Sequence, residues 1–223
     1  MISLEKQGNV FVLRLQNGEN RFNFDSIDEL NGALDKVEAE SDPIALVTVG
    51  EGKFYSNGLD LDFMSKAGAQ QAFENVGRVH GVLGRMLGFP CITVAAINGH
   101  AFAAGAMFAL AHDYRVMRND RGFFCLPEVD IGMTFTPSME SLIKARLSKQ
   151  TAHEAMVTGR RYTSMEALAA SIVHQSVPEA EVLPASIALA TKHAKADRNT
   201  LTGIKRSLYK ETLEIVAKET SPK

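Results

Sequence analysis

The sequence predicts an α/β protein on three observations. Two continuous apolar runs of strand length, Ile44–Val49 and Cys91–Ile97, are separated by a helical pattern. Runs that are apolar on both faces are typical of buried, largely parallel strands. From about Pro137 onward the pattern turns helical. We therefore expect a core region over residues 1–160 and a helical region over residues 161–223, in a chain whose length fits one large domain.

The elements of the core region follow from periodicity and turn residues. Residues 2–15 alternate apolar and polar side chains around a Gly-Asn turn, which predicts a β-hairpin. A capping-box pattern that begins at Ser26 predicts a helix up to Glu40. A second helix is expected over Gln70–Leu87, where apolar residues recur on one face, and a short strand over Tyr114–Met117.

The last third carries helical periodicity in several segments. A second capping box, at Thr163, marks the start of one of them. The helices expected here cover Pro137–Leu147, Lys149–Val157, Ala167–Ala170, Leu183–Lys195 and Thr200–Ala217.

Composition excludes several classes of protein. The formal net charge of −2 and the isoelectric point near 6.3 do not fit a general nucleic-acid binder. The longest apolar stretch is interrupted by Asn98, Gly99 and His100, so neither piece reaches the roughly 20 residues that a membrane span needs. The first ten residues include charges and no apolar signal segment, and the six histidines show no metal-ligand spacing. We expect a soluble, cytoplasmic protein without a metal.

Two glycine-containing turns are candidates for ligand binding. Asn57-Gly58 follows the Ile44–Val49 strand and places the amide of Leu59 before a short helix over Asp60–Met64. The second turn, Asn98-Gly99, follows the next strand and precedes a helix made of small residues. Two such turns can direct two backbone N–H groups at one point, which is the geometry of an oxyanion hole. Ordinary turns at strand ends give the same pattern, so spacing alone leaves both interpretations open.

Glu128 is an isolated carboxylate between Leu126-Pro127 and Val129. An ionised carboxylate without partners is costly to bury, and its pKa rises, which suits a group that carries protons. Alternatively, Glu128 caps a turn or faces solvent while its neighbours pack. The residues alone do not decide between these two interpretations.

Four motifs, in this order and at these separations, resemble the enoyl-CoA hydratase/isomerase (crotonase) superfamily, and most of all its Δ3,Δ2-enoyl-CoA isomerases. They are Phe54–Leu61, Ile97–Gly105, His112–Arg115 and Leu126–Gly132, and the resemblance covers nearly the whole chain. It implies a crotonase-like spiral of ββα units followed by a C-terminal helical trimerisation region. It also implies a homotrimer or a dimer of trimers.

The resemblance assigns three site residues. The backbone amides of Leu59 and Ala104 fall at the two oxyanion-hole positions, although many members carry three glycines where this chain has Ala103-Ala104-Gly105. Glu128 falls at the position of the acid/base glutamate. Hydratases of the family have a second glutamate where this chain has Met107, so the sequence favours an isomerase, which needs one proton carrier and no positioned water.

The expected reaction shifts the double bond of a 3-enoyl-CoA to give the 2-trans-enoyl-CoA, a step of fatty acid β-oxidation, with coenzyme A present only as part of the substrate. Alternatives are an enoyl-CoA hydratase, another acyl-CoA reaction on the same scaffold, and a non-catalytic acyl-CoA-binding protein. For the CoA phosphates, Lys205 or Arg206 of a neighbouring subunit are further candidates. The residues expected to contact substrate are Arg21, Lys53, Asn57, Gly58, Asp60, Met107, Phe124 and Met133.

Overall fold

The computed structural model describes residues 1–194 and 197–220. Its strands form two sheets, one with the order β1-β2-β3-β5-β7-β9 and a smaller one with the order β4-β6-β8. The strands are β1 (Ile2–Gln7), β2 (Val10–Leu15), β3 (Ala45–Gly50), β4 (Phe54–Ser56), β5 (Ile92–Ile97), β6 (His100–Phe102), β7 (Tyr114–Arg118), β8 (Phe124–Cys125) and β9 (Gln175–Val177).

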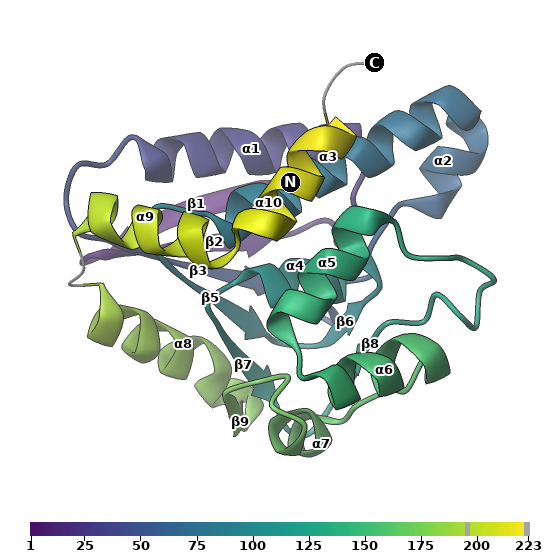
Figure 1. The fold of residues 1–223 in the computed structure, drawn as a ribbon. Coiled ribbons are helices and arrows are strands. Elements are labelled where there is room, and N and C mark those ends of the chain that lie inside the picture. The colour runs from purple at the N-terminus through teal and green to yellow at the C-terminus, as the bar shows by residue number, and fades with distance from the viewer. Residues whose placement is uncertain (195–196, 221–223) are drawn as a thin grey trace.

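Helices cover both sheets and make up most of the C-terminal third (Figure 1). They are α1 (Phe24–Glu38), α2 (Leu61–Ala67), α3 (Ala69–Leu87), α4 (Ala104–Ala111), α5 (Pro137–Arg146), α6 (Lys149–Thr158), α7 (Ser164–Ala169), α8 (Glu179–His193), α9 (Arg198–Leu208) and α10 (Lys210–Thr220).

The predicted hairpin and parallel sheet are confirmed. β1 and β2 pair antiparallel, whereas the pairs β2–β3, β3–β5, β5–β7 and β7–β9 are all parallel. Alternate side chains of β3 face opposite sides of the large sheet, and both sides are covered, which explains why most of this strand is apolar. Leu46 belongs to the core that contains α1 and α3, and Ala45 and Val47 belong to the core that contains α8. Figure 1 shows α8 on one side of the large sheet and α1 on the other.

The small sheet was not predicted. Its strands have two or three residues, too few for a period of two to be recognised. They are parallel to one another. β4 runs directly into the predicted Asn57-Gly58 turn, whereas the predicted Asn98-Gly99 turn lies between β5 and β6, and β6 leads into α4 through Ala103. Helix α4 contacts both β4 and β6, and every one of its residues is buried. The small sheet therefore holds the Asn57-Gly58 turn and the Ala103 junction against a central apolar helix.

Several predicted helix boundaries were wrong. Helix α1 begins at Phe24 because Asn23, and not Ser26, is its N-cap; the side chain of Ser26 completes that capping box. The Thr163 capping box is confirmed, but its helix begins directly after it. The helix expected over Leu183–Lys195 begins four residues earlier, and Lys195 lies outside the described residues.

The region expected to be purely helical contributes to the large sheet through β9. The single helix expected over Thr200–Ala217 is two helices, because the chain leaves helical geometry at Tyr209. The Tyr209 hydroxyl accepts a hydrogen bond from Arg146 of α5. The division at residue 160 stays a prediction.

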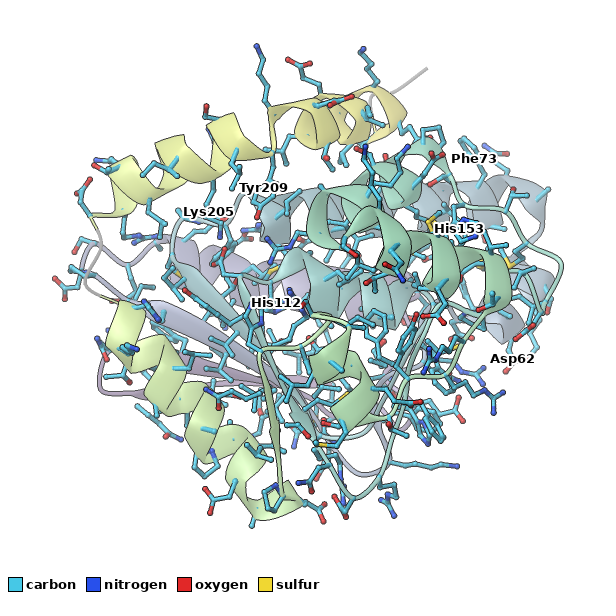
Figure 2. All side chains as sticks on the ribbon, turned by 60° about the horizontal axis from the view of Figure 1, so that its bottom comes forward. Asp62, Phe73, His112, His153, Lys205 and Tyr209 are labelled. Carbon is cyan, nitrogen blue, oxygen red and sulfur yellow. The ribbon has the colours of Figure 1, made fainter. Side chains whose placement is uncertain are left out.

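A buried ion pair attaches α9 to the core. Nζ of Lys205 lies 3.0 Å from Oδ2 of Asp113, and the Lys205 side chain is only 5% exposed. In Figure 2, Lys205 and Tyr209 lie between the C-terminal helices and the core. Lys205 therefore does not fit the predicted contact with a CoA phosphate. Within the described ranges, no helix combines the length and apolar character that crossing a membrane requires.

Candidate active site

The first turn follows β4 and is held by Phe22. The N–H of Phe22 donates to the Gly58 carbonyl at 2.8 Å, and the N–H of Asp60 donates to the Phe22 carbonyl at 3.0 Å. Since these two bonds flank Leu59 in a parallel bridge, the Leu59 N–H points away from Phe22. Among the described residues, the Leu59 amide has no hydrogen-bond acceptor.

The short helix after this turn is capped by Asp60 and not by Asp62. The Asp60 carboxylate accepts from the N–H of Phe63 at 3.0 Å. Asp62 instead pairs with Arg21, whose guanidinium lies 2.8 Å from Oδ2 of Asp62.

The second turn at the site is at Ala103, which follows β6 and opens α4; the predicted Asn98-Gly99 turn lies before β6. Ala103 is the N-cap of this helix, so the Ala104 N–H belongs to the first helical turn, where no intrahelical acceptor exists. No acceptor for it occurs elsewhere in the part of the chain that is described. A free N–H at a helix N-terminus attracts negative charge.

The two turns lie against each other. Gly58 has a φ of +81°, and a Cβ placed on it would lie 3.0 Å from the Ala103 Cβ and 3.0 Å from the Ala104 nitrogen. Leu59 and Ala104 both line one pocket. The structure thus brings together the two amides that the sequence indicated.

Ala103 has a strained backbone, with φ +49° and ψ −126°. An L-residue with a side chain rarely adopts this conformation, whereas glycine does so at little cost. We expect Ala103→Gly to raise the free energy of unfolding by about 1 kcal/mol, with the catalytic rate retained. Thermal or urea unfolding checks this, and a destabilised variant would contradict the strain.

Glu128 lies in the same pocket and is 5% exposed. The turn that holds it is closed by hydrogen bonds from the N–H of Asp130 to the Pro127 carbonyl and from the N–H of Met133 to the Glu128 carbonyl, both 2.9 Å long. Oε2 of Glu128 is buried and has no hydrogen-bond partner within the described ranges. Of the two interpretations that the sequence left open, burial applies.

The pKa of Glu128 is raised from 4.5 to about 7, because burial disfavours the charged carboxylate. The positive charge of Arg21 does not compensate for this burial. Arg21 lines the pocket, but Glu19 and Asp62 pair with it at 2.7 and 2.8 Å. A carboxyl group in this state is able both to accept and to return a proton near neutral pH.

The pocket has a volume of about 320 Å³ and a mostly apolar lining. Six residues with predicted site roles line it, namely Arg21, Asn57, Leu59, Ala104, Glu128 and Met133. Further lining residues that the sequence did not single out are Asp62, Phe102, Ala103, Ile131, Thr134 and Met139. Their positions depend on contacts between distant segments, for which the sequence gives no local signal.

Other predicted substrate contacts are not among the lining residues. Met107 and Phe124 are 0% exposed and belong to the hydrophobic core, because α4 and the small sheet pack directly together. Lys53 is exposed, with its Nζ 5.5 Å from the centre of the Phe54 ring. Asp60 caps α2 outside the pocket, and Gly58 allows the two turns to approach.

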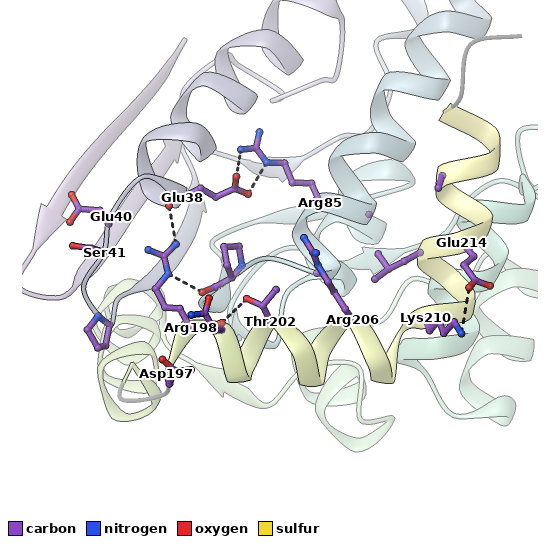
Figure 3. Close-up of a pocket in the computed structure, with 17 residues that line it drawn as sticks. Glu38, Glu40, Ser41, Arg85, Asp197, Arg198, Thr202, Arg206, Lys210 and Glu214 are labelled. Atoms are coloured by element: carbon purple, nitrogen blue, oxygen red, sulfur yellow. Dashed lines mark hydrogen bonds and ion pairs between the residues drawn. The ribbon is translucent and has the colours of Figure 1, made fainter.

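A larger pocket, of about 980 Å³, lies elsewhere, between α1, α3, α9 and α10 (Figure 3). Several of its charged residues are already bonded to one another or to backbone. Arg85 pairs with Glu38 at 3.0 Å, and Arg198 donates to the carbonyls of Pro90 and Glu38. Glu128 and the two free amides line the smaller pocket, which we therefore take as the candidate active site.

The arrangement defines a class of site. The buried carboxyl group of Glu128 shares a mostly apolar pocket with Leu59 and Ala104, whose N–H groups have no acceptor among the described residues. Such a site can remove a proton next to a carbonyl and stabilise the resulting enolate oxygen.

Comparison with known proteins identifies the family. The model described as enoyl-CoA hydratase/isomerase matches residues 5–221, and the chain belongs to this family. It is 36% identical to the peroxisomal enoyl-CoA delta isomerase 2 of Arabidopsis thaliana, covering 99% of this chain and 97% of that protein. It is 34% identical to a putative enoyl-CoA hydratase of Thermus thermophilus, covering 87% of this chain and 78% of that protein.

The fold is also that of the family. The human mitochondrial delta3-delta2-enoyl-CoA isomerase superposes with a TM-score of 0.90 at 22% identity, over 98% of this chain and 87% of that structure. The crotonase fold, with two sheets and C-terminal helices, is therefore confirmed.

Proposed function

We propose that this protein is a Δ3,Δ2-enoyl-CoA isomerase. The observation that carries the proposal is Glu128, a buried carboxyl group whose Oε2 has no partner in the described structure and which shares a pocket with two free amides. The other carboxylate that lines the pocket, Asp62, is 79% exposed and paired with Arg21. Relatives named as isomerases, at 36% and 35% identity, support the same choice.

In the proposed reaction, the Glu128 carboxylate removes a proton from C2 of the 3-enoyl thioester. The electron pair of the broken C2–H bond forms a double bond between C1 and C2, and the carbonyl π electrons move to the thioester oxygen, where negative charge develops. The amides of Leu59 and Ala104 donate hydrogen bonds to this oxygen, and each such donor contributes about 3 kcal/mol to transition-state stabilisation. Protonated Glu128 then returns the proton to C4, which gives the 2-trans-enoyl-CoA. Coenzyme A takes part only as the substrate's thioester.

The proposed base must be ionised when substrate binds. Because burial raises the pKa of Glu128 to about 7, kcat/KM is expected to rise with pH up to about 7 and then to level off. A pH–rate profile with a 3-enoyl-CoA checks this. A profile that is already flat from pH 5 upward would contradict a buried glutamate base.

One assay distinguishes the proposal from its alternatives. The protein is incubated with 3-hexenoyl-CoA, and conjugated thioester and 3-hydroxyacyl-CoA are measured in the same sample. An isomerase forms the 2-trans-enoyl-CoA without hydroxyacyl-CoA. Hydroxyacyl-CoA formed at a comparable rate would favour a hydratase, and binding without any product would favour the non-catalytic alternative.

The remaining expectations are also proposals. Arg21 and Asn57 are positioned at the pocket to meet the polar part of CoA, with exposed Lys53 as a further candidate for its phosphates. A homotrimer or a dimer of trimers is supported by the exposed apolar residues Ile204 and Leu208 on α9. A cytoplasmic location is likewise a proposal from the sequence, and the Arabidopsis relative is named as peroxisomal. A role in fatty acid β-oxidation follows from the proposed reaction.

A further inference from the structure

Asn20 occupies an unusual position beside the first turn. It is 5% exposed and has a φ of +52°, in the left-handed region. Asparagine tolerates this region better than most residues, because its short side chain can bond to nearby backbone. Here that side chain does bond to backbone, but it reaches a distant segment of the chain.

The Asn20 carboxamide bonds to the backbone of β4. Its Nδ2 donates to the carbonyls of Phe54 and Tyr55, at 3.1 and 3.2 Å. Its Oδ1 accepts from the N–H of Asn17 at 2.8 Å, which fixes the orientation of the carboxamide. One buried side chain thus ties two consecutive carbonyls of β4 to the loop that contains Asn20 and Asn17.

A second set of hydrogen bonds connects the backbone of Asn20 to the Asn57-Gly58 turn. The hydroxyl of Ser56 donates to the Asn20 carbonyl at 2.7 Å, and the N–H of Gly58 donates to that hydroxyl oxygen at 3.3 Å. The next residue is Leu59, whose amide faces the pocket. Asn20 is therefore connected to the proposed first oxyanion donor through Ser56 and Gly58.

We infer that Asn20 is a positioning residue, whose carboxamide sets the direction of the Leu59 N–H. It does not line the pocket, so it acts through the backbone and not by touching substrate. This inference rests on the proposed function, because it assumes that the Leu59 amide stabilises an enolate oxygen. A misdirected donor lowers the stabilisation of the transition state more than it lowers the affinity for the substrate.

The test combines kinetics with a spectroscopic signal. Asn20→Ala is expected to lower kcat about 10²-fold, with little change in KM for 3-hexenoyl-CoA. The enolate absorption of bound 3-oxobutanoyl-CoA is expected to fall in parallel, because it reports directly on stabilisation of the thioester oxygen. A purely structural role lowers the melting temperature and leaves the enolate band of the folded protein intact.

Three further variants make the test specific. Asn20→Asp keeps the acceptor for Asn17 but loses the donor, and is expected to behave like Asn20→Ala. Asn20→Gly adopts the left-handed conformation without strain, so it tests the carboxamide alone if Asn20→Ala does not fold. Asn17→Ala is the matched control: this exposed residue of the same loop uses only its backbone to contact Asn20, and wild-type behaviour is expected.

Two results would overturn the inference. One is wild-type kcat and a wild-type enolate band in folded Asn20→Ala. The other is recovery of both in Asn20→Gly, which would assign the effect to backbone strain. If the wild type forms an enolate from 3-oxobutanoyl-CoA but does not isomerise 3-hexenoyl-CoA, the proposed isomerase is wrong. Loss of the band in Asn20→Ala would then still support the positioning role.

Discussion

Replacing Glu128 with glutamine is expected to lower the rate of isomerisation by about 10³- to 10⁴-fold. The same carboxyl group is proposed to remove the proton from C2 and to return it to C4, so its loss affects both steps. Glutamine has nearly the same volume and fits the same buried position. Steady-state kinetics with 3-hexenoyl-CoA measure the effect. A folded Glu128→Gln variant with nearly wild-type rate would exclude Glu128 as the base.

Asp130→Asn is the matched control for this variant. Asp130 carries a carboxylate in the same turn, but it is exposed and does not line the pocket. The same change from carboxylate to carboxamide is therefore expected to leave kcat close to the wild-type value. A large loss in this control would show that the turn, and not the proton carrier, was perturbed.

The Glu128→Gln variant is also expected to be more stable than the wild type above pH 7. The pKa of Glu128 is raised from 4.5 to about 7 in the folded state, so the folded protein binds more protons than the unfolded chain between these values. The contribution of Glu128 to the free energy of unfolding falls as the pH rises from about 4.5 to about 7 and is constant above that. The variant avoids this cost, which amounts to up to about 3 kcal/mol and is measurable by urea unfolding at pH 8.

The second large effect concerns the amide of Ala104. Ala104→Pro removes this N–H and is expected to lower kcat by about 10²- to 10³-fold. Residue 104 is the first residue of helix α4, the position at which proline is best tolerated, and no hydrogen bond of the described structure is lost. A folded variant with wild-type kcat would show that this amide does not stabilise the enolate.

Ala104→Gly is the control for the proline variant, because it changes the side chain but retains the N–H. We expect it to keep a rate close to that of the wild type. Ala103→Gly combined with Ala104→Pro relieves the strained φ of +49° at the preceding residue. If the combined variant is stable and remains inactive, the loss belongs to the missing donor.

The large sheet could be predicted because burial on both faces leaves a clear mark in the sequence. Leu46 and Val47 face different cores, so β3 is apolar on both faces apart from the buried Thr48. The small sheet has no comparable sequence pattern, since its strands of two or three residues are too short to show the two-residue period of a β-strand. The cap of α1 was misplaced because Asn23 and Ser26 share one capping box, and only the backbone conformation distinguishes the N-cap.

For the site, the sequence predicted the three central groups but not their surroundings. Glu128 and the two turns belong to segments whose motifs were recognisable, and the structure places all three in one pocket. The pairing of Arg21 with Asp62, separated by many residues, could not be foreseen, because it depends on how α2 returns to the loop before α1. Met107 was expected at the substrate, but the packing of α4 buries it completely.

The most direct test of a single buried proton carrier is an isotope measurement. A 3-hexenoyl-CoA that carries deuterium at C2 is converted in ordinary water, and the deuterium content at C4 of the product is measured early in the reaction. Because one carboxyl group, 5% exposed, is proposed both to remove and to return the proton, we expect deuterium to appear at C4. A product with no deuterium at C4 from the first turnovers would contradict transfer by one shielded carboxyl group.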